Sequence, residues 1–345
     1  MSETQLQNQT QFWIDTTPGY FECVLVPIIC VFGLVSNIIC LYIFQILEFC
    51  NKTDIETQLY KNLKLESAIV AVNLFFQTFR VFFLIKSFQT TYVYNIFTLY
   101  FLWILPAVLE LMALMTHTAS TIDYYVLVRE TSLHCSHIFK IIKASFIFKT
   151  FVMLILSVVT FSYLFFCFEV DWIDNSDFNS TTHGFYAIKP QNFNRTSLKK
   201  IIEIIAYLIR DFLMILILIL MNILIYMQVK NALKNKKKLL YNSAFINNSD
   251  LNNLTLIKHK TKMKHASKKT IIMVAITSLN NIFGRVPILL YFIIRNIYEE
   301  NEILGKIGIL TVYISYSLNS LIFFFINNRF RTALINKYRH FSTRF

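Results

Sequence analysis

Five charged residues lie inside stretches of sequence that are otherwise apolar: Arg80, Glu110, Arg210, Asp211 and Arg285. A charge at the centre of a membrane-spanning helix costs roughly 2.5–3.5 kcal/mol on insertion scales, so such side chains face other protein groups or water. Guanidinium and carboxylate groups can pair with one another, or each can bind the opposite charge of a ligand. Because Arg210 and Asp211 are adjacent, we expect them not to face one another on a helix, and at least one to find a partner elsewhere.

Two interpretations of these charges remain open. In the first, Glu110 and Arg285 form an ion pair between two helices. In the second, the arginines line a pocket with excess positive charge that holds a carboxylate, from a peptide C-terminus or an acidic small molecule. The second interpretation predicts four ligand-binding residues, Arg80, Glu110, Arg210 and Arg285.

The residue types needed for catalysis or metal binding do not gather in the sequence. The 7 histidines are scattered, mostly between the apolar runs, and we expect His134 and His137 to be solvated. The 6 cysteines show no CxxC spacing, which argues against a zinc site. We therefore expect no catalytic residue, no metal and no cofactor, and we do not expect an enzyme.

Apolar runs of membrane length position the charged residues. The chain is 55% hydrophobic and only 15% charged, and one bilayer span needs roughly 20 mostly apolar residues. The predicted fold is an all-α membrane protein, a bundle of seven transmembrane helices with a short amphipathic eighth helix. The expected segments are an extracellular N-terminal tail at 1–19, a seven-helix domain at 20–327 with spans at about 20–47, 65–85, 95–128, 145–168, 201–229, 270–294 and 307–326, a long basic cytosolic loop at 230–269, and the eighth helix and cytosolic tail at 328–345.

The distribution of Lys and Arg predicts the orientation of the bundle. The net charge is +13, and the cations gather after the first, third and fifth spans and in the C-terminal tail. The positive-inside rule then places the N-terminus outside and the C-terminus in the cytosol. The same rule explains the cations without a nucleic-acid partner, and membrane lipids are expected beside them. The sequons at Asn8, Asn179 and Asn194 would lie outside, and we predict glycosylation there.

Short motifs near the ends of the spans follow one another along the chain. Together they resemble the motifs of rhodopsin-like (class A) G-protein-coupled receptors, and the resemblance covers about residues 20–338. The motifs are Gly33…Asn37 in the first span, Asp123-Tyr124-Tyr125 at the end of the third, Asn222…Tyr226 in the fifth, Pro287 in the sixth, Asn319-Ser320…Phe323 in the seventh and Asn328-Arg329-Phe330-Arg331 at the start of the eighth helix.

Several positions depart from the pattern of that family. Tyr124 stands in place of the motif arginine, Phe323 in place of the motif tyrosine, and Arg285 in place of the tryptophan before the kink proline. The helix-two aspartate is missing from Leu65–Val72, and no cysteine lies where the outer disulfide of the family would need one. The chain therefore resembles a divergent, invertebrate-type member of the family, an orphan with respect to ligand.

Two ligand subgroups do not fit the sequence. An opsin needs a lysine in the outer half of the last span to form its Schiff base, whereas the only lysine there is Lys306, at the extreme end of the span. An amine receptor needs an acid about four turns outward from Asp123, where this chain has Pro106.

The resemblance implies a multi-pass receptor of the plasma membrane. It would bind an extracellular peptide or small chemical cue, as a neuropeptide or chemosensory receptor does, and activate a heterotrimeric G protein. Asn37 would form polar contacts between helices, in a network shared with Asn319. A transporter or channel is the alternative, although internal repeats are missing. The residues implied in activation and coupling are Asp123, Tyr124, Tyr125, Tyr226, Pro287, Asn319 and Phe323.

Overall fold

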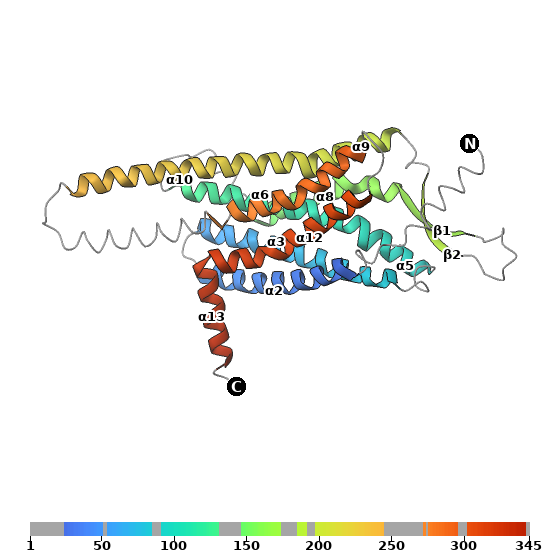
Figure 1. The fold of residues 1–345 in the computed structure, drawn as a ribbon, viewed down its shortest axis with the longest axis horizontal. Helices are drawn as coiled ribbons and strands as arrows, with labels where there is room; N and C mark the ends of the chain where they lie inside the picture. Colours follow the sequence, from blue (N-terminus) through green and yellow to red (C-terminus); the bar gives the residue numbers. More distant parts are fainter. Residues whose placement is uncertain are drawn as a thin grey trace.

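The computed structural model describes residues 24–50, 54–84, 91–130, 146–173, 185–191, 197–244, 272–273, 275–295 and 302–342. Seven helices in these ranges are long and apolar enough to cross a membrane, and we number them as spans one to seven. Figure 1 shows them running side by side along the long axis of the molecule. They cover Val26–Phe49, Thr57–Phe82, Tyr92–Val126, Phe146–Phe166, Ser197–Gln228, Ala275–Arg295 and Ile303–Ile326.

Several spans combine more than one helical segment. Span one is α2 (Val26–Cys50), and span seven is α12 (Glu302–Ile326). The sixth span, Ala275–Arg295, is called helix six below. The remaining spans are α3 (Asp54–Thr78) with η2 (Phe79–Leu84); α5 (Tyr92–Phe97) with η3 (Thr98–Ile104) and α6 (Leu105–Glu130); α8 (Phe146–Phe161) with η4 (Ser162–Phe166); and α9 (Ser197–Tyr207) with η6 (Leu208–Leu213) and α10 (Met214–Ala244).

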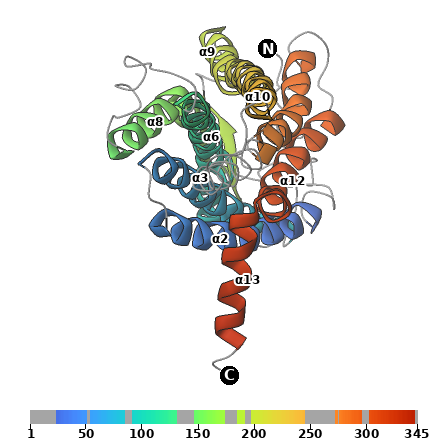
Figure 2. The same ribbon diagram turned by 90° about the vertical axis from the view of Figure 1, so that its left-hand side faces the viewer.

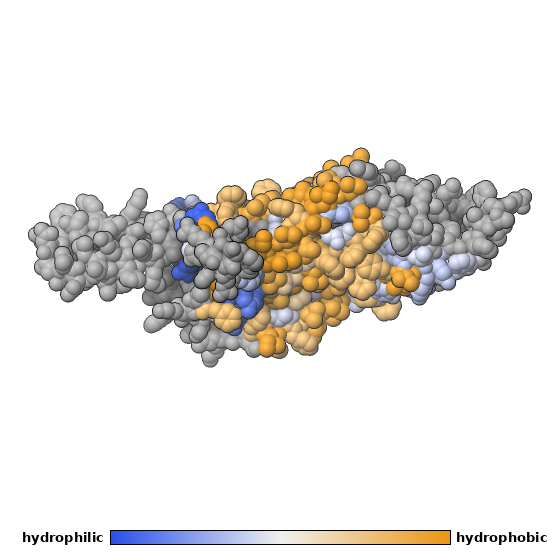
Figure 3. Space-filling model, turned by 90° about the horizontal axis from the view of Figure 1, so that it is seen from below, coloured by the Kyte–Doolittle hydropathy of each residue, from blue (hydrophilic) through white to orange (hydrophobic). Residues whose placement is uncertain are grey.

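The surface of the bundle is apolar over its middle, as a membrane protein requires. Figure 3 shows a broad band of hydrophobic side chains, with hydrophilic ones gathered toward its two ends. Large residues such as Phe148, Phe151, Val159 and Phe283 are exposed on this surface. Such exposure would be costly in water, but it matches the hydrocarbon core of a bilayer.

The predicted eighth helix is α13 (Asn328–Ser342), which leaves the bundle at a steep angle (Figures 1 and 2). Asn327 caps its first turn, because the side-chain Oδ1 accepts hydrogen bonds from the backbone N–H groups of Arg329 at 3.0 Å and Phe330 at 3.2 Å. The Phe330 ring is buried against Phe44 and Phe323, with centroid distances of 5.6 and 6.1 Å. This aromatic contact fixes the start of α13 to spans one and seven.

The opposite end of the bundle carries a pair of β-strands, which the all-α prediction lacks. Strands β1 (Phe168–Ile173) and β2 (Phe185–Pro190) form an antiparallel hairpin between spans four and five. The sequence of β1 alternates apolar and polar residues, the period of a strand with one covered face. Asn95 of α5 anchors the hairpin by donating from Nδ2 to the Tyr186 carbonyl at 3.0 Å. The seven spans and the eighth helix are otherwise confirmed.

Two helices are longer than the sequence suggested. Helix α3 begins at Asp54, whereas we expected the second span to begin at 65. The added turns are amphipathic, and Lys64 pairs with Glu48 of α2 at 2.5 Å. Helix α10 continues to Ala244 through residues expected in the basic loop, because lysine, leucine and alanine are good helix formers. The predicted glycosylation sites Asn8, Asn179 and Asn194 lie outside the described residues.

Candidate functional site

Arg285 lies at the centre of a buried group of charges between four spans. Its side chain belongs to helix six and is 2% exposed. Nη1 donates to Glu110 Oε2 of span three at 2.9 Å and to Asp211 Oδ1 of span five at 3.3 Å. Nη2 donates to the Tyr316 hydroxyl of span seven. One guanidinium therefore joins spans three, five, six and seven.

Arg210 and Asp211 contact one another directly, so the expectation that neighbouring residues cannot pair is wrong. Arg210 Nη2 lies 2.6 Å from Asp211 Oδ2, and Nε lies 3.0 Å from both carboxylate oxygens. Both residues belong to η6, a π-helical turn inside span five. In a regular α-helix, the side chains of consecutive residues do not face one another. In this π-helical turn, both charged side chains are buried in the bundle.

We call Glu110, Arg210, Asp211, Arg285 and Tyr316 the ion cluster. It holds two guanidinium groups and two carboxylates, and all four charged side chains are buried. Arg210 also approaches Glu110 at 3.6 Å and lies over the Tyr207 ring, 4.7 Å from its centroid. Buried charges of opposite sign compensate one another only when paired and hydrogen-bonded, as these are. The cluster therefore carries no excess of positive charge.

Arg80 stands apart from these pairings. It lies in η2, at the end of span two that is nearer the hairpin, and it is partly exposed. Its Nε donates to Gln77 Oε1 at 2.5 Å. Within the described ranges, no carboxylate lies at ion-pair distance from the Arg80 guanidinium. Of the four predicted ligand-binding residues, three thus belong to the ion cluster, and Arg80 is a separate cation.

The Asp123-Tyr124-Tyr125 motif lies toward the α13 end of the bundle. Asp123 Oδ2 accepts a hydrogen bond from Asn62 Nδ2 of α3 at 2.6 Å. Tyr124 is fully buried in the apolar core at this end, and Tyr125 packs at its edge. Phe323 belongs to the same core, where its ring meets Phe44 edge to face at 5.0 Å.

The expected network between Asn37 and Asn319 divides into two separate contacts with span seven. Asn37 Nδ2 donates to the carbonyls of Gly33 at 2.8 Å and Tyr316 at 3.1 Å. Asn319 Oδ1 instead accepts from Asn280 Nδ2 of helix six at 3.1 Å. The two amides thus face different neighbours, and span seven is attached to span one and to helix six at different points.

The remaining predicted residues occupy contrasting environments. Tyr226 is 66% exposed on α10, so its side chain does not enter the interhelical packing. Pro287 is partly buried in helix six, next to Ile288. At Gly308 of span seven, a Cβ atom would lie 2.9 Å from the Ile288 Cα, so glycine permits close contact of the two helices there.

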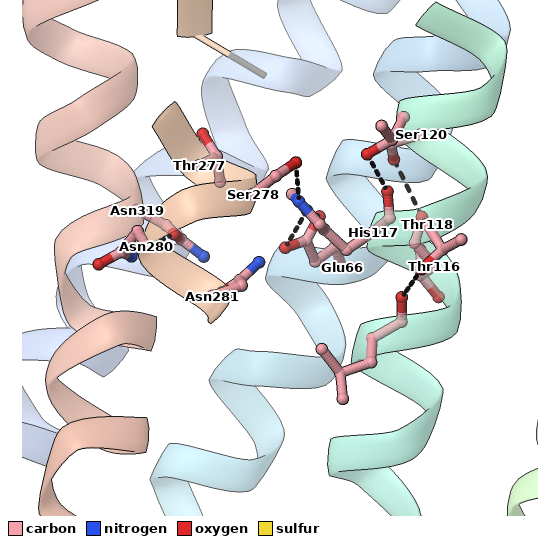
Figure 4. A network of polar contacts seen from close by, with 12 residues as sticks. Glu66, Thr116, His117, Thr118, Ser120, Thr277, Ser278, Asn280, Asn281 and Asn319 are labelled. Atoms are coloured by element: carbon pink, nitrogen blue, oxygen red, sulfur yellow. Dashed lines mark hydrogen bonds and ion pairs between the residues drawn. The ribbon is translucent and has the colours of Figure 1, made fainter. Parts of the chain in front are cut away.

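A second buried polar network was not predicted from the sequence, and Figure 4 shows it at close range. His117 of span three places Nδ1 3.1 Å from both carboxylate oxygens of Glu66 in α3. Its Nε2 lies 3.0 Å from the Ser278 hydroxyl of helix six. The histidines were expected mostly in loops, but His117 lies inside the third apolar run. His117 is seven residues from Glu110, a spacing that puts both residues on one helix face. This spacing could have revealed that His117 faces the interior of the bundle.

Comparisons with known proteins identify the fold. No family model matches the chain, and no curated protein matches its sequence. Among solved structures, the crystal structure of squid rhodopsin superposes with a TM-score of 0.63, covering 94% of this chain and 86% of that one. This chain has the rhodopsin fold. The sequence identity is 14%, so the likeness concerns the fold alone.

The likeness of fold does not define the side chains inside the bundle, which are those of this chain. The interior of span seven contains no lysine, since Lys306 lies at the beginning of α12. The described residues contain no group of three or more His, Cys, Asp or Glu side chains placed to hold a metal ion. Two buried polar groups of the described residues connect several spans, the ion cluster and the Glu66–His117–Ser278 network.

Proposed function

We propose that the chain is a rhodopsin-like G-protein-coupled receptor of the plasma membrane, with its N-terminus and hairpin outside and α13 in the cytosol. It binds an extracellular peptide or small chemical cue and activates a heterotrimeric G protein. The rhodopsin fold, the basic cytosolic segments and the order of the motifs support this proposal.

The observation that carries the proposal is the contact of Arg285 with three other spans. A receptor needs a bundle with two arrangements and a ligand that binds one of them better than the other. Arg285 contacts Glu110, Asp211 and Tyr316, which belong to spans three, five and seven. A ligand that shifts any of these spans relative to helix six would therefore change the contacts of Arg285. A ligand bound on the hairpin side of the cluster could then alter these contacts and change the packing of helix six.

The charges of the described residues support a ligand that carries an acidic group. The ion cluster is neutral, so it provides no net attraction for a charged group. Arg80 is partly exposed and lacks a carboxylate partner within the described ranges. We assign to Arg80 the contact with an acidic group of the ligand, and to Glu110, Arg210 and Arg285 the response to its binding.

The coupling end of the receptor lies near α13. We assign the switch to Asp123, Tyr124, Tyr125, Asn319 and Phe323, which join α3, α6, helix six and span seven there. Tyr226 would join them only after a rotation of α10, because its ring is now exposed. Pro287 marks the part of helix six about which such a rearrangement would turn.

The test is ligand-evoked signalling in cells that express the chain with a promiscuous G protein. A panel of neuropeptides and small acidic metabolites is applied, and G-protein dissociation is recorded by energy transfer. The proposal expects concentration-dependent dissociation with at least one cue, absent from cells without the chain. Transport of a panel compound into the cells without G-protein activation would contradict the proposal and favour a transporter.

A further inference from the structure

The pairing of β1 with β2 determines which backbone groups of each strand point away from the hairpin. The Gln191 backbone N–H donates to the Cys167 carbonyl at 2.9 Å, so these residues form a hydrogen-bonded pair at the end of the ladder. In an antiparallel ladder, hydrogen-bonded and non-hydrogen-bonded pairs alternate. The register then makes Val170 and Ile188 a non-hydrogen-bonded pair. The N–H and C=O groups of Val170 therefore point away from β2, and those of Ile188 point away from β1.

The two outer edges of the hairpin differ in what lies beside them. Helix α5 covers the β2 edge, because Asn95 Nδ2 donates to the Tyr186 carbonyl at 3.0 Å and the Tyr92 ring contacts the Tyr186 ring at 5.1 Å. On the β1 edge, no other described residue forms a hydrogen bond with the backbone of Val170. An open strand edge is a template for a further strand. The β1 edge therefore offers a donor and an acceptor for one.

The side chains of β1 alternate between two faces of the hairpin. The Phe168 ring contacts the Trp103 ring of span three at a centroid distance of 5.7 Å, so this face of β1 lies toward the bundle. Glu169 and Asp171 lie on the opposite face and are exposed. Asp171 is paired with Lys189 at 2.9 Å. Within the described ranges, no lysine or arginine lies at ion-pair distance from Glu169, whose carboxylate only accepts a long hydrogen bond from a glutamine.

The charges of β1 decide which kind of strand fits its open edge. A second copy of β1, paired antiparallel about Val170, would put Glu169 of one chain opposite Asp171 of the other. Like charges directly opposite one another destabilise a strand pair, whereas opposite charges stabilise it. A strand with a lysine or arginine opposite Glu169 therefore fits this edge better than a second copy of the chain.

We propose that the β1 edge binds an extended peptide as a third strand of the hairpin, with a basic side chain beside Glu169. This inference rests on the proposed receptor function, and it assigns the extracellular cue to the peptides. The peptide residue opposite Val170 exchanges two backbone hydrogen bonds with it, and its side chain lies toward span three. The neighbouring peptide residue lies opposite Glu169 on the solvent side. The ligand thus carries a basic residue next to an apolar one, and its terminal carboxylate remains available for Arg80.

Proline substitutions test the backbone contact. Val170→Pro removes the outward N–H group without removing a hydrogen bond between β1 and β2, because proline lacks only the amide hydrogen. Ile188→Pro is the matched control, since it makes the same change at the directly opposite position, on the edge that α5 covers. Glu169→Gln removes the charge and keeps the size of the side chain. Tryptophan fluorescence of each variant reports whether the hairpin stays folded.

The probe is a dye-labelled peptide of alternating lysine and valine. Its binding to the full chain, held in nanodiscs of zwitterionic lipid, is measured by fluorescence anisotropy, and empty nanodiscs give the background. A second probe has the same sequence with N-methyl groups on the valine nitrogens. It keeps the charge and the side chains but cannot donate a hydrogen bond to the Val170 carbonyl. The comparison of the two probes uses the parent protein, so it holds even where a proline variant unfolds the hairpin.

The expected result is saturable binding of the first probe to the parent protein. Loss of one backbone hydrogen bond in Val170→Pro should weaken binding about 2- to 10-fold, and Glu169→Gln should weaken it up to about 5-fold. The N-methylated probe should bind at least as weakly as the first probe binds to Val170→Pro, and Ile188→Pro should match the parent.

Equal binding of the two probes, equal weakening in Ile188→Pro, or no saturable binding to the parent would overturn the proposal. Self-association of the chain that is lost in Val170→Pro would also overturn it, and would assign the edge to a second copy. The binding assay contains no G protein, so a failure of the proposed receptor function would be seen separately in the signalling assay.

Discussion

Arg285 Nη1 stands 2.9 Å from Glu110 Oε2, and both side chains are buried in the middle of the bundle. Removing one partner of a buried ion pair leaves the other charge uncompensated, which typically costs about 3–5 kcal/mol. We therefore expect Arg285→Met to lower the thermal stability of the detergent-solubilised protein strongly, as measured by size-exclusion chromatography after heating.

Arg285→Met leaves the ion cluster with one carboxylate too many, and removing that negative charge should restore thermal stability. Arg285→Met combined with Asp211→Asn leaves Glu110 with Arg210, which already lie 3.6 Å apart. This double variant should recover much of the loss, because no unpaired charge remains in the cluster. If Arg285→Met alone were as stable as the parent, the ion cluster would have no structural importance.

Arg80 is expected to control ligand potency rather than folding. A hydrogen bond to a charged group is worth about 1.5–3 kcal/mol, so Arg80→Gln should raise the half-maximal concentration of an acidic ligand on the order of 10- to 100-fold. Surface expression should not change, since Arg80 has no carboxylate partner in the described residues. Arg295→Gln is the control, an exposed cation that already faces Glu203. Equal potency in Arg80→Gln and the parent would contradict the assignment.

The hairpin should respond to pH through Asp171. A hydrogen bond from Lys189, at 2.9 Å, lowers the pKa of Asp171 below its ordinary value of 3.8. A lowered carboxyl pKa means that the pairing stabilises the hairpin above the ordinary value and loses its effect as the pH falls through the lowered one. Trp172 fluorescence, recorded after Trp13→Phe and Trp103→Phe, should therefore stay constant from pH 7 to 5 and change only in stronger acid.

Lys189→Met tests the cause of this shift. Without the ammonium group, the pKa of Asp171 should return toward its ordinary value, so the fluorescence change should move to higher pH. The effect on overall stability should be small, because Asp171 is exposed and Lys189 is partly exposed. An unchanged transition would show that Lys189 is not responsible.

Close contact between helix six and span seven should be sensitive to a single methyl group. At Gly284, an added Cβ would lie 2.6 Å from the Ser315 Cβ, so Gly284→Ala should push the helices apart and lower thermal stability. Gly305→Ala is the matched control, because the three atoms nearest to its added Cβ all belong to the Tyr291 ring, the closest at 3.1 Å, a milder approach to a side chain. Equal stability of the two variants would show that the helices tolerate a wider separation.

The sequence predicted those features that depend on local composition. Seven apolar runs of membrane length predicted the spans, and the basic amphipathic segment after Asn327 predicted α13. Because a charge in hydrocarbon is energetically unfavourable, the sequence predicted that Glu110 and Arg285 need partners, and the two side chains pair with each other. The added hairpin was missed because its two short strands lie in a polar loop between spans.

Features that depend on helix rotation or irregularity could not be predicted. The Arg210–Asp211 contact lies in the π-turn η6, an irregularity that residue spacing does not reveal. His117 meets Glu66 and Ser278 across 51 and 161 residues of sequence. Such pairings depend on how three helices turn toward one another. The exposure of Tyr226 has the same origin, since the rotation of α10 decides which of its residues face the bundle.

The attachment of the hairpin has a consequence for how the protein matures. The hairpin contains no cysteine, and Cys167 beside it is a buried free thiol. The position of the hairpin depends on the Asn95–Tyr186 hydrogen bond and on the Tyr186 ring, which contacts Tyr92 and Trp172. Formation of this surface therefore needs no oxidising step, and exposure to a reducing environment leaves its anchoring contacts intact.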